Sequence, residues 1–168
     1  MLAAHVSQLT GARGSGDWGL DHGAWSVLRS LFPDADVPVV QFSLDRNKSA
    51  AEHYAAGSKL AALRDDGVMI LGSGNIVHNL RYFRGPAQLF PRAKRFDDAV
   101  IDRILTNDHL ALIDYTSLDE EADLSVPTDE HFIPLLYVIG AKDQTECAEI
   151  FCADVLNSIS MTSVAYGV

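Results

Sequence analysis

The segment that most constrains the fold is the short apolar run Val68-Met69-Ile70-Leu71, together with the turn Gly72-Ser73-Gly74-Asn75 that follows it. The run predicts a buried strand. The glycines let the backbone turn sharply at the end of that strand, because a residue without Cβ tolerates backbone angles that other residues avoid. His78 comes just after the turn, at the carboxyl end of the strand, where open α/β sheets usually place their functional groups.

A second strand and a helix precede this run. Residues 37–44 are rich in β-branched side chains and apolar enough to be buried on both faces of a sheet. Ser49 and Glu52 have the spacing of a capping box, which predicts a helix from Ser49 to about Asp66. Strand, helix and strand at these lengths predict a right-handed, parallel βαβ unit. We therefore expect an α/β fold, in which a mainly parallel sheet is flanked by helices on both faces.

The other elements are predicted from apolar periodicity and turn residues. Helices are expected over residues 2–9, 24–32, 93–106 and 109–115, and from Thr128 to near Gly140. Pro134 should bend the last of these, because proline removes a helical hydrogen bond. Between the helices we expect a loop at residues 82–91 and an acidic, irregular segment at residues 116–126. The carboxyl-terminal part should form two antiparallel strands around Asn157.

Composition excludes several classes of function. A formal net charge of -10 disfavours nucleic acid and anionic membranes as partners. No apolar run is long enough to cross a membrane, and Met1 to Ser7 contains no Lys or Arg of the kind that opens a signal peptide, so a cytoplasmic location is expected. Cys147 and Cys152 fit no common zinc motif and are expected to be reduced. The length suits one domain with a sizeable core.

Histidines lie at the ends of three of these elements. His22 stands between an acid and a glycine before a predicted helix, His78 follows the glycine turn, and His131 lies in the first turn of a later helix. Histidine titrates near neutral pH and is the commonest metal ligand, so acid–base and ligand roles are both open. The structural alternatives are capping for His22, a surface position for His131, and a capping or structural role for His78. The remaining histidines match no motif: His5, His53 and His109.

A resemblance to the class III extradiol ring-cleavage dioxygenases of the LigB type, in the 4,5-DOPA dioxygenase branch, is carried by three segments: Gly19-Leu20-Asp21-His22-Gly23-Ala24-Trp25, Gly72-Ser73-Gly74-Asn75-Ile76-Val77-His78-Asn79-Leu80-Arg81 and Thr128-Asp129-Glu130-His131-Phe132-Ile133-Pro134. Each motif is weak alone, but their order and spacing make the resemblance specific. It covers nearly the whole chain.

The resemblance implies a reaction and a set of site residues. The reaction would be metal-dependent cleavage of a catechol such as DOPA, with both atoms of dioxygen incorporated. It calls for a metal with open positions, such as Fe(II), with Zn(II) as the alternative at the same site. His22 would be an acid–base or substrate-contacting residue, and His78 a base, a metal ligand or both. His131 would be a metal ligand, with Glu130 as a competitor for that role.

The chain departs from the family pattern at its amino end. Family members begin with a strand and a His-Gly-Ser-Pro-like motif, and they carry a second metal-binding histidine after another strand; this sequence has neither. Residues 1–168 are therefore expected to be a single, apparently truncated extradiol dioxygenase domain that lacks part of its metal site. The alternative hypothesis is a catalytically impaired homologue that acts as a metal- or ligand-binding or partner-dependent subunit. A homo-oligomer or a complementing amino-terminal segment would then complete it.

Overall fold

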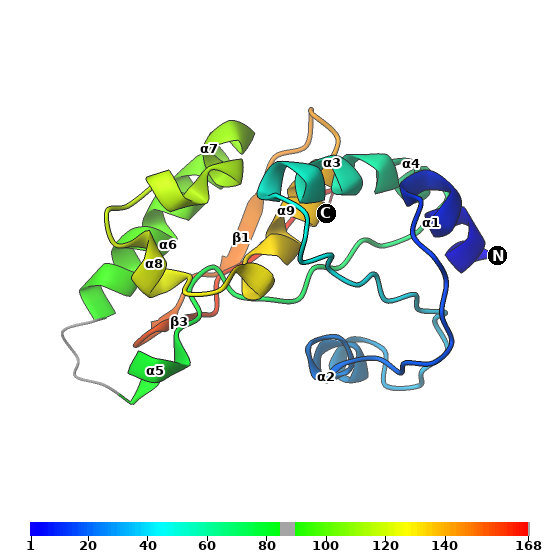
Figure 1. Cartoon of the computed structure of the whole chain (residues 1–168), viewed down its shortest axis with the longest axis horizontal. Helices are drawn as coiled ribbons and strands as arrows, with labels where there is room; N and C mark the ends of the chain where they lie inside the picture. The colour runs from blue at the N-terminus through cyan, green and yellow to red at the C-terminus, as the bar shows by residue number, and fades with distance from the viewer. Residues whose placement is uncertain (85–89, 168) are drawn as a thin grey trace.

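The computed structural model describes residues 1–84 and 90–167, and helices make up most of the described chain (Figure 1). The α-helices are α1 (Leu2–Thr10), α2 (His22–Leu31), α3 (Ala50–Leu60), α4 (Ala62–Asp65), α5 (Leu80–Phe83), α6 (Phe90–Leu105), α7 (His109–Ile113), α8 (Ala122–Ser125) and α9 (Ile133–Ala141). The strands are β1 (Glu149–Cys152), β2 (Val155–Leu156), β3 (Ile159–Ser160) and β4 (Ser163–Ala165). The fold is therefore mixed α/β, as expected from the sequence.

The strands form antiparallel pairs near the carboxyl end. β1 pairs with β4, and β2 pairs with β3. The tight connection between β2 and β3 contains Asn157, whose φ of 57° lies in the left-handed region that asparagine tolerates better than most residues. The prediction of antiparallel strands around Asn157 is confirmed.

The expectation of hydrogen-bonded strands at residues 37–44 and 68–71 is wrong for this structure. Both segments run as extended chain below α3 in the view of Figure 1, and neither belongs to a sheet of the described residues. β-Branched and apolar residues favour extended backbone, but a strand also needs a second backbone alongside to complete its hydrogen bonds. No described segment supplies that backbone, so the described residues contain no parallel sheet.

The helix between these segments follows its local signals. Ser49 Oγ accepts a hydrogen bond from the Glu52 amide at 3.3 Å, and the Glu52 carboxylate accepts one from the Ser49 amide at 2.8 Å, so the predicted capping box is present. α3 then crosses α9 at very short range. A Cβ atom placed on Gly57 would lie 2.5 Å from the carbonyl oxygen of Tyr137, which shows that the two helix backbones nearly touch.

The apolar core lies between α3, α6 and α9. Its fully buried side chains are Leu63, Val77, Phe96, Val100, Ile104, Leu112, Phe132, Ile133, Leu136 and Ile139. Burying one such side chain stabilises the fold by roughly 1.5–3 kcal/mol. α6 also carries the buried carboxylate of Asp97, which accepts hydrogen bonds from Ser160 Oγ at 2.5 Å and Thr162 Oγ1 at 2.8 Å. These bonds fasten the end of β3 to α6.

The start of α9 differs from the sequence prediction. Pro134 occupies the first turn of the helix rather than its interior. A first-turn amide has no partner within the helix, so proline removes no helical hydrogen bond there. Thr128 does not cap the helix; its hydroxyl donates to Glu130 at 2.9 Å, and a 3-10 turn (Asp129–His131) leads into α9. Part of the loop expected at residues 82–91 lies outside the described residues.

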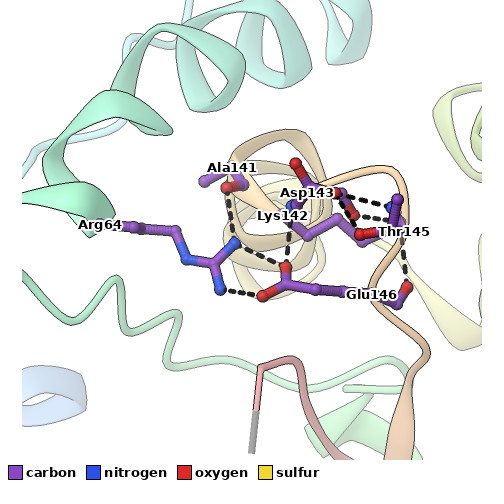
Figure 2. Close-up of polar contacts among 6 residues, drawn as sticks. All are labelled: Arg64, Ala141, Lys142, Asp143, Thr145 and Glu146. Atoms are coloured by element: carbon purple, nitrogen blue, oxygen red, sulfur yellow. Dashed lines mark hydrogen bonds and ion pairs between the residues drawn. The ribbon is translucent and has the colours of Figure 1, made fainter.

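The remaining features of the fold are local, and one of them differs from the sequence prediction. The segment expected to be irregular at residues 116–126 contains α8. Arg64, which belongs to α4, donates to Glu146 at 2.6 Å and to the Ala141 carbonyl at 3.1 Å, joining α4 to the end of α9 (Figure 2). Both cysteines are free thiols, as expected, with Cys147 exposed and Cys152 half-buried. None of the described helices has the length and apolar character needed to cross a bilayer.

Candidate functional site

His78 is fixed by backbone contacts to two other parts of the chain. Its amide donates to the Ser125 carbonyl at 2.9 Å, and it forms an isolated antiparallel bridge with Ile159. The next residue, Asn79, is buried, and its side-chain amide donates to the Leu124 carbonyl at 2.8 Å. His78 and Asn79 are therefore anchored to α8 and β3.

The sharp turn expected at residues 72–75 is absent, because the backbone there forms no turn or bend and neither of its glycines has a positive φ. This glycine segment (residues 72–75) is extended, and it fixes His131 by close backbone approach. The Asn75 amide donates to the His131 carbonyl at 2.9 Å. A Cβ atom on Gly74 would lie 2.1 Å from that carbonyl oxygen, so only glycine leaves room for it. The rings of His78 and His131 stack, with 3.5 Å between centroids and 23° between ring planes. The structure therefore brings together two of the three histidines singled out in the sequence.

His22 approaches the same place as the first residue of α2. Asp21, rather than His22, caps the helix, since its carboxylate accepts a hydrogen bond from the Ala24 amide at 2.9 Å. Ser73, in the glycine segment, donates from its hydroxyl to the Gly23 carbonyl at 2.7 Å. His22 therefore has no capping role, and the backbone next to it is bonded to the segment that leads to His78.

The electrostatics of the site favour neutral imidazoles. Burial lowers the pKa of His78, and the neighbouring His131 lowers it further. Burial also lowers the pKa of His131, with His22 adding to the shift and Glu130 opposing it. Neutral imidazole can accept a proton or bind a metal, so these shifts suit either role.

The described residues do not form a complete metal site. Within residues 1–84 and 90–167, no group of three or more His, Cys, Asp or Glu side chains is arranged to hold a metal ion. His78 and His131 offer two imidazoles, stacked face to face. Metal centres that activate small molecules commonly need three protein ligands and open positions. The metal implied by the resemblance therefore lacks a full ligand set among the described residues.

An open cleft of about 640 Å³ borders the residues just before His131. Its walls include Tyr115 and Val126, which offer apolar contact, and Arg46, Asp129 and Glu130, which carry charge. Glu130 lines the cleft and precedes His131 in the chain, and its negative charge opposes the lowering of the pKa of both His78 and His131. The cleft has room for a small aromatic molecule.

The other histidines lie outside this site. His53 is buried and its Nδ1 lies 2.9 Å from the Tyr137 hydroxyl, while His109 Nδ1 lies 2.8 Å from the Tyr54 hydroxyl. His5 lies on α1, 3.9 Å from an Asp66 carboxylate oxygen. The sequence did not indicate that Ser73 and Asn75 would fix the site. Both residues nevertheless lie in the glycine segment, which the sequence marked as important.

Comparison with known proteins identifies the family. The family model described as the catalytic LigB subunit of aromatic ring-opening dioxygenase matches residues 3–168. The chain belongs to the LigB family. The resemblance read from the three motifs is therefore confirmed.

Curated relatives and a solved structure agree with this assignment. The chain is 45% identical over 157 residues to 4,5-DOPA dioxygenase extradiol of Escherichia coli (strain K12), covering 89% of this chain and 57% of that protein. It is 34% identical over 133 residues to 4,5-DOPA dioxygenase extradiol of Beta vulgaris, covering 79% of this chain and 50% of that protein. The chain thus spans little more than half the length of these relatives. A crystal structure of an uncharacterized protein from Escherichia coli K12 matches with a TM-score of 0.86 at 41% identity, covering 97% of this chain and 70% of that one.

Proposed function

We propose that this LigB-family chain is a metal-dependent extradiol ring-cleavage dioxygenase that acts on a catechol such as DOPA and incorporates both atoms of dioxygen. The observation that carries the proposal is the stacked pair of His78 and His131 in a chain of this family, with the residue after His22 bonded to Ser73 in the glycine segment. Relatives named 4,5-DOPA dioxygenase extradiol support the choice of substrate.

Each histidine has a role in the proposal. His22 is the acid–base residue that exchanges a proton with the catechol, and His78 is a base or a metal ligand. His131 is the second ligand, with Glu130 as its competitor, and the catechol ring enters through the cleft beside Glu130. The metal is Fe(II), with Zn(II) as the alternative. Among the described residues, these two imidazoles do not complete its ligand set.

The rest of the assignment is also a proposal. Residues 1–168 form a single domain in which the extended segments 37–44 and 68–71 join a mainly parallel sheet once further strands pair with them. The protein works in the cytoplasm, with catechol and dioxygen as its small-molecule partners and without nucleic acid or membrane.

The test is ring cleavage of L-DOPA by protein supplied with Fe(II), followed by the absorbance of the yellow muconic semialdehyde product. The chain is assayed alone and with the amino-terminal segment of the Escherichia coli relative. His22→Ala should slow the active preparation by ~10²–10⁴-fold, the usual contribution of a positioned proton-transfer group. His5→Ala is the matched control, because His5 lies on α1 outside the site, and it should keep the rate. A wild-type rate in His22→Ala or His78→Ala would contradict the assigned roles.

The second candidate is a catalytically impaired subunit that binds metal or ligand and depends on a partner. The incomplete ligand set and the unpaired extended segments favour it. Metal binding by the chain alone should then be weak but should depend on His78 and His131, because each missing ligand removes part of the coordination that fixes affinity. Calorimetric titration with Zn(II) of the wild type and of His78→Ala measures this. Equal affinities would reject His78 as a ligand.

A further inference from the structure

Helix α2, which carries His22, is held only loosely by packing. Figure 1 shows α2 apart from the other helices, joined to them by long extended connections. None of its residues is buried, and Trp25 and Leu31 are 50% and 52% exposed. Burial of apolar side chains, which fixes α3 and α9, therefore does little to fix the position of α2. Some other interaction has to hold His22 at the site.

Hydrogen bonds on both sides of His22 supply that interaction. On one side, the Asp21 amide donates to Gln41 Oε1 at 2.9 Å, and Gln41 Nε2 donates back to the Asp21 carboxylate at 3.0 Å. On the other side, Ser73 Oγ donates to the Gly23 carbonyl at 2.7 Å. Gln41 lies in an extended segment and Ser73 in the glycine segment. The neighbours of His22 on both sides are thus hydrogen-bonded to two separate parts of the chain.

Each bond is specific to its side chain. The reciprocal pair at Gln41 needs a carbonyl oxygen and an amide N–H on one side chain, which only Asn and Gln provide. The bond from Ser73 needs a hydroxyl within reach of the Gly23 carbonyl. The Asp21 carboxylate also caps α2 through Ala24, so the bond from Gln41 orients the helix start as a whole.

We propose that Gln41 and Ser73 are positioning residues that hold the start of α2, and with it His22, next to the glycine segment that leads to His78. The role rests on the proposed function, in which His22 transfers a proton. Proton transfer requires the ring to lie within hydrogen-bond reach of its partner, and a displacement of about 1 Å can cost roughly 10²-fold in rate. Neither residue needs to touch the substrate.

The first test measures how firmly α2 is held in place, and it needs no catalytic activity. In the Gln41→Ala/Ser73→Ala double variant, amide hydrogen exchange of α2 should become about 10- to 100-fold faster, since three side-chain hydrogen bonds are lost. Exchange in α3 and α9 should stay unchanged, which excludes general unfolding. Ser163→Ala is the matched control, because Ser163 also donates from its hydroxyl to a backbone carbonyl but lies on β4. Ser73→Thr keeps a hydroxyl and should restore slow exchange at that contact.

The second test asks whether the two residues act through His22. In a preparation that cleaves L-DOPA, the double variant should lower kcat by about 10-fold or more with little change in KM, since the loss concerns proton transfer. Adding His22→Ala to the double variant should cause no loss beyond that of His22→Ala alone. A merely structural role would instead give losses that multiply.

The outcomes separate the two proposals. Unchanged exchange in α2 overturns the positioning role, whatever the activity. Faster exchange confined to α2 supports it even when no preparation cleaves catechol, a result that would count against the proposed function alone. Losses of kcat that multiply with His22→Ala overturn the claim that Gln41 and Ser73 act through His22.

Discussion

Gly74 is the residue on which the geometry of the site depends most directly. The carbonyl oxygen of His131 occupies the space where a Cβ would be, at 2.1 Å, and the neighbouring amide of Asn75 binds the same oxygen. Backbone cannot yield as a flexible side chain can. The stacking of His78 and His131 therefore requires a glycine here.

Gly74→Ala should destabilise the protein by about 1–3 kcal/mol, the usual cost of forcing extra atoms into a filled space. It should also separate the two rings, because His131 has to move. Urea unfolding measures the loss of unfolding free energy. Calorimetric titration with Zn(II) measures whether the separated rings of His78 and His131 bind metal more weakly. Gly14→Ala is the control, since a Cβ on Gly14 meets no atom within 4 Å. Equal stability of the two variants would contradict the close approach at Gly74.

The sequence marks candidate site residues but not the contacts that place them. His22, His78 and His131 each stand in a recognisable motif, and the structure stacks the rings of His78 and His131. Gln41 and Ser73 stand in no pattern that reveals their partners. Their hydrogen bonds span 20 residues to Asp21 and 50 to Gly23, so they exist only once the chain has folded. Patterns in the local sequence therefore do not predict such contacts.

Among the elements, α3 is joined to its neighbours by two tyrosine–histidine pairs. His53 of α3 bonds to the hydroxyl of Tyr137 in α9, and Tyr54 of α3 bonds to His109 in α7. The first pair is buried, with His53 3% and Tyr137 7% exposed, whereas the second is only partly buried. A polar group left without a partner costs most where water cannot replace the partner.

Tyr137→Phe should therefore cost about 1–3 kcal/mol of unfolding free energy, because it leaves a buried imidazole nitrogen without its bond. Tyr54→Phe, the matched change at the other pair, should cost about 0.5–1.5 kcal/mol. Urea unfolding of the two variants gives the comparison. A larger loss in Tyr54→Phe than in Tyr137→Phe would contradict the assignment of the buried bond to the α3–α9 contact.

Elements whose signals are local are the ones the sequence predicted well. α3 begins at its capping box, and the turn at Asn157 joins β2 to β3 as expected. Residues 37–44 and 68–71 have strand composition but lack a second backbone to pair with, and pairing is not a local property. Pro134 shows a different limit: its effect depends on where α9 begins, and helix boundaries are the least certain part of a sequence pattern.

For the whole molecule, one buried and three half-buried histidines contribute to the dependence of stability on pH. Loss of contact with water lowers the pKa of His53, His78, His109 and His131 from their ordinary value of 6.5. Below about pH 6.5 the unfolded chain takes up protons on these rings that the folded chain does not, so stability falls as the pH falls. The loss continues until the pH passes the lowered pKa of each ring in the folded state.

Thermal unfolding between pH 7.5 and 5.5 should therefore show a Tm that decreases with acidification. His53→Gln and His109→Gln each remove one of the titrating rings away from the site, so each should make the decrease shallower. A Tm that stays constant or rises over this range would contradict the inferred burial of neutral histidines.

The last feature of the whole molecule is the unpaired extended chain of residues 37–44 and 68–71, which we call the apolar edge. Its exposed side chains are Val37, Val39, Val40, Met69 and Leu71, which are 38–67% exposed. Among the described residues, no backbone hydrogen bond involves residues 37–44 or 69–74. Unpaired backbone beside exposed apolar side chains favours association with another strand. We therefore expect the isolated 168-residue chain to be oligomeric or poorly soluble, with negligible cleavage of catechols.

Adding an amino-terminal segment with the His-Gly-Ser-Pro-like motif should cover this apolar edge and supply the missing ligands. The mixture should then be monodisperse by light scattering and should form the yellow ring-cleavage product. Val39→Lys should reduce association of the isolated chain but also prevent complementation, because both depend on the same edge. Leu156→Lys is the control, since Leu156 is 56% exposed on β2, away from that edge, and should change neither. A soluble, monomeric chain that cleaves catechol without the added segment would contradict a role for the apolar edge in completing the site.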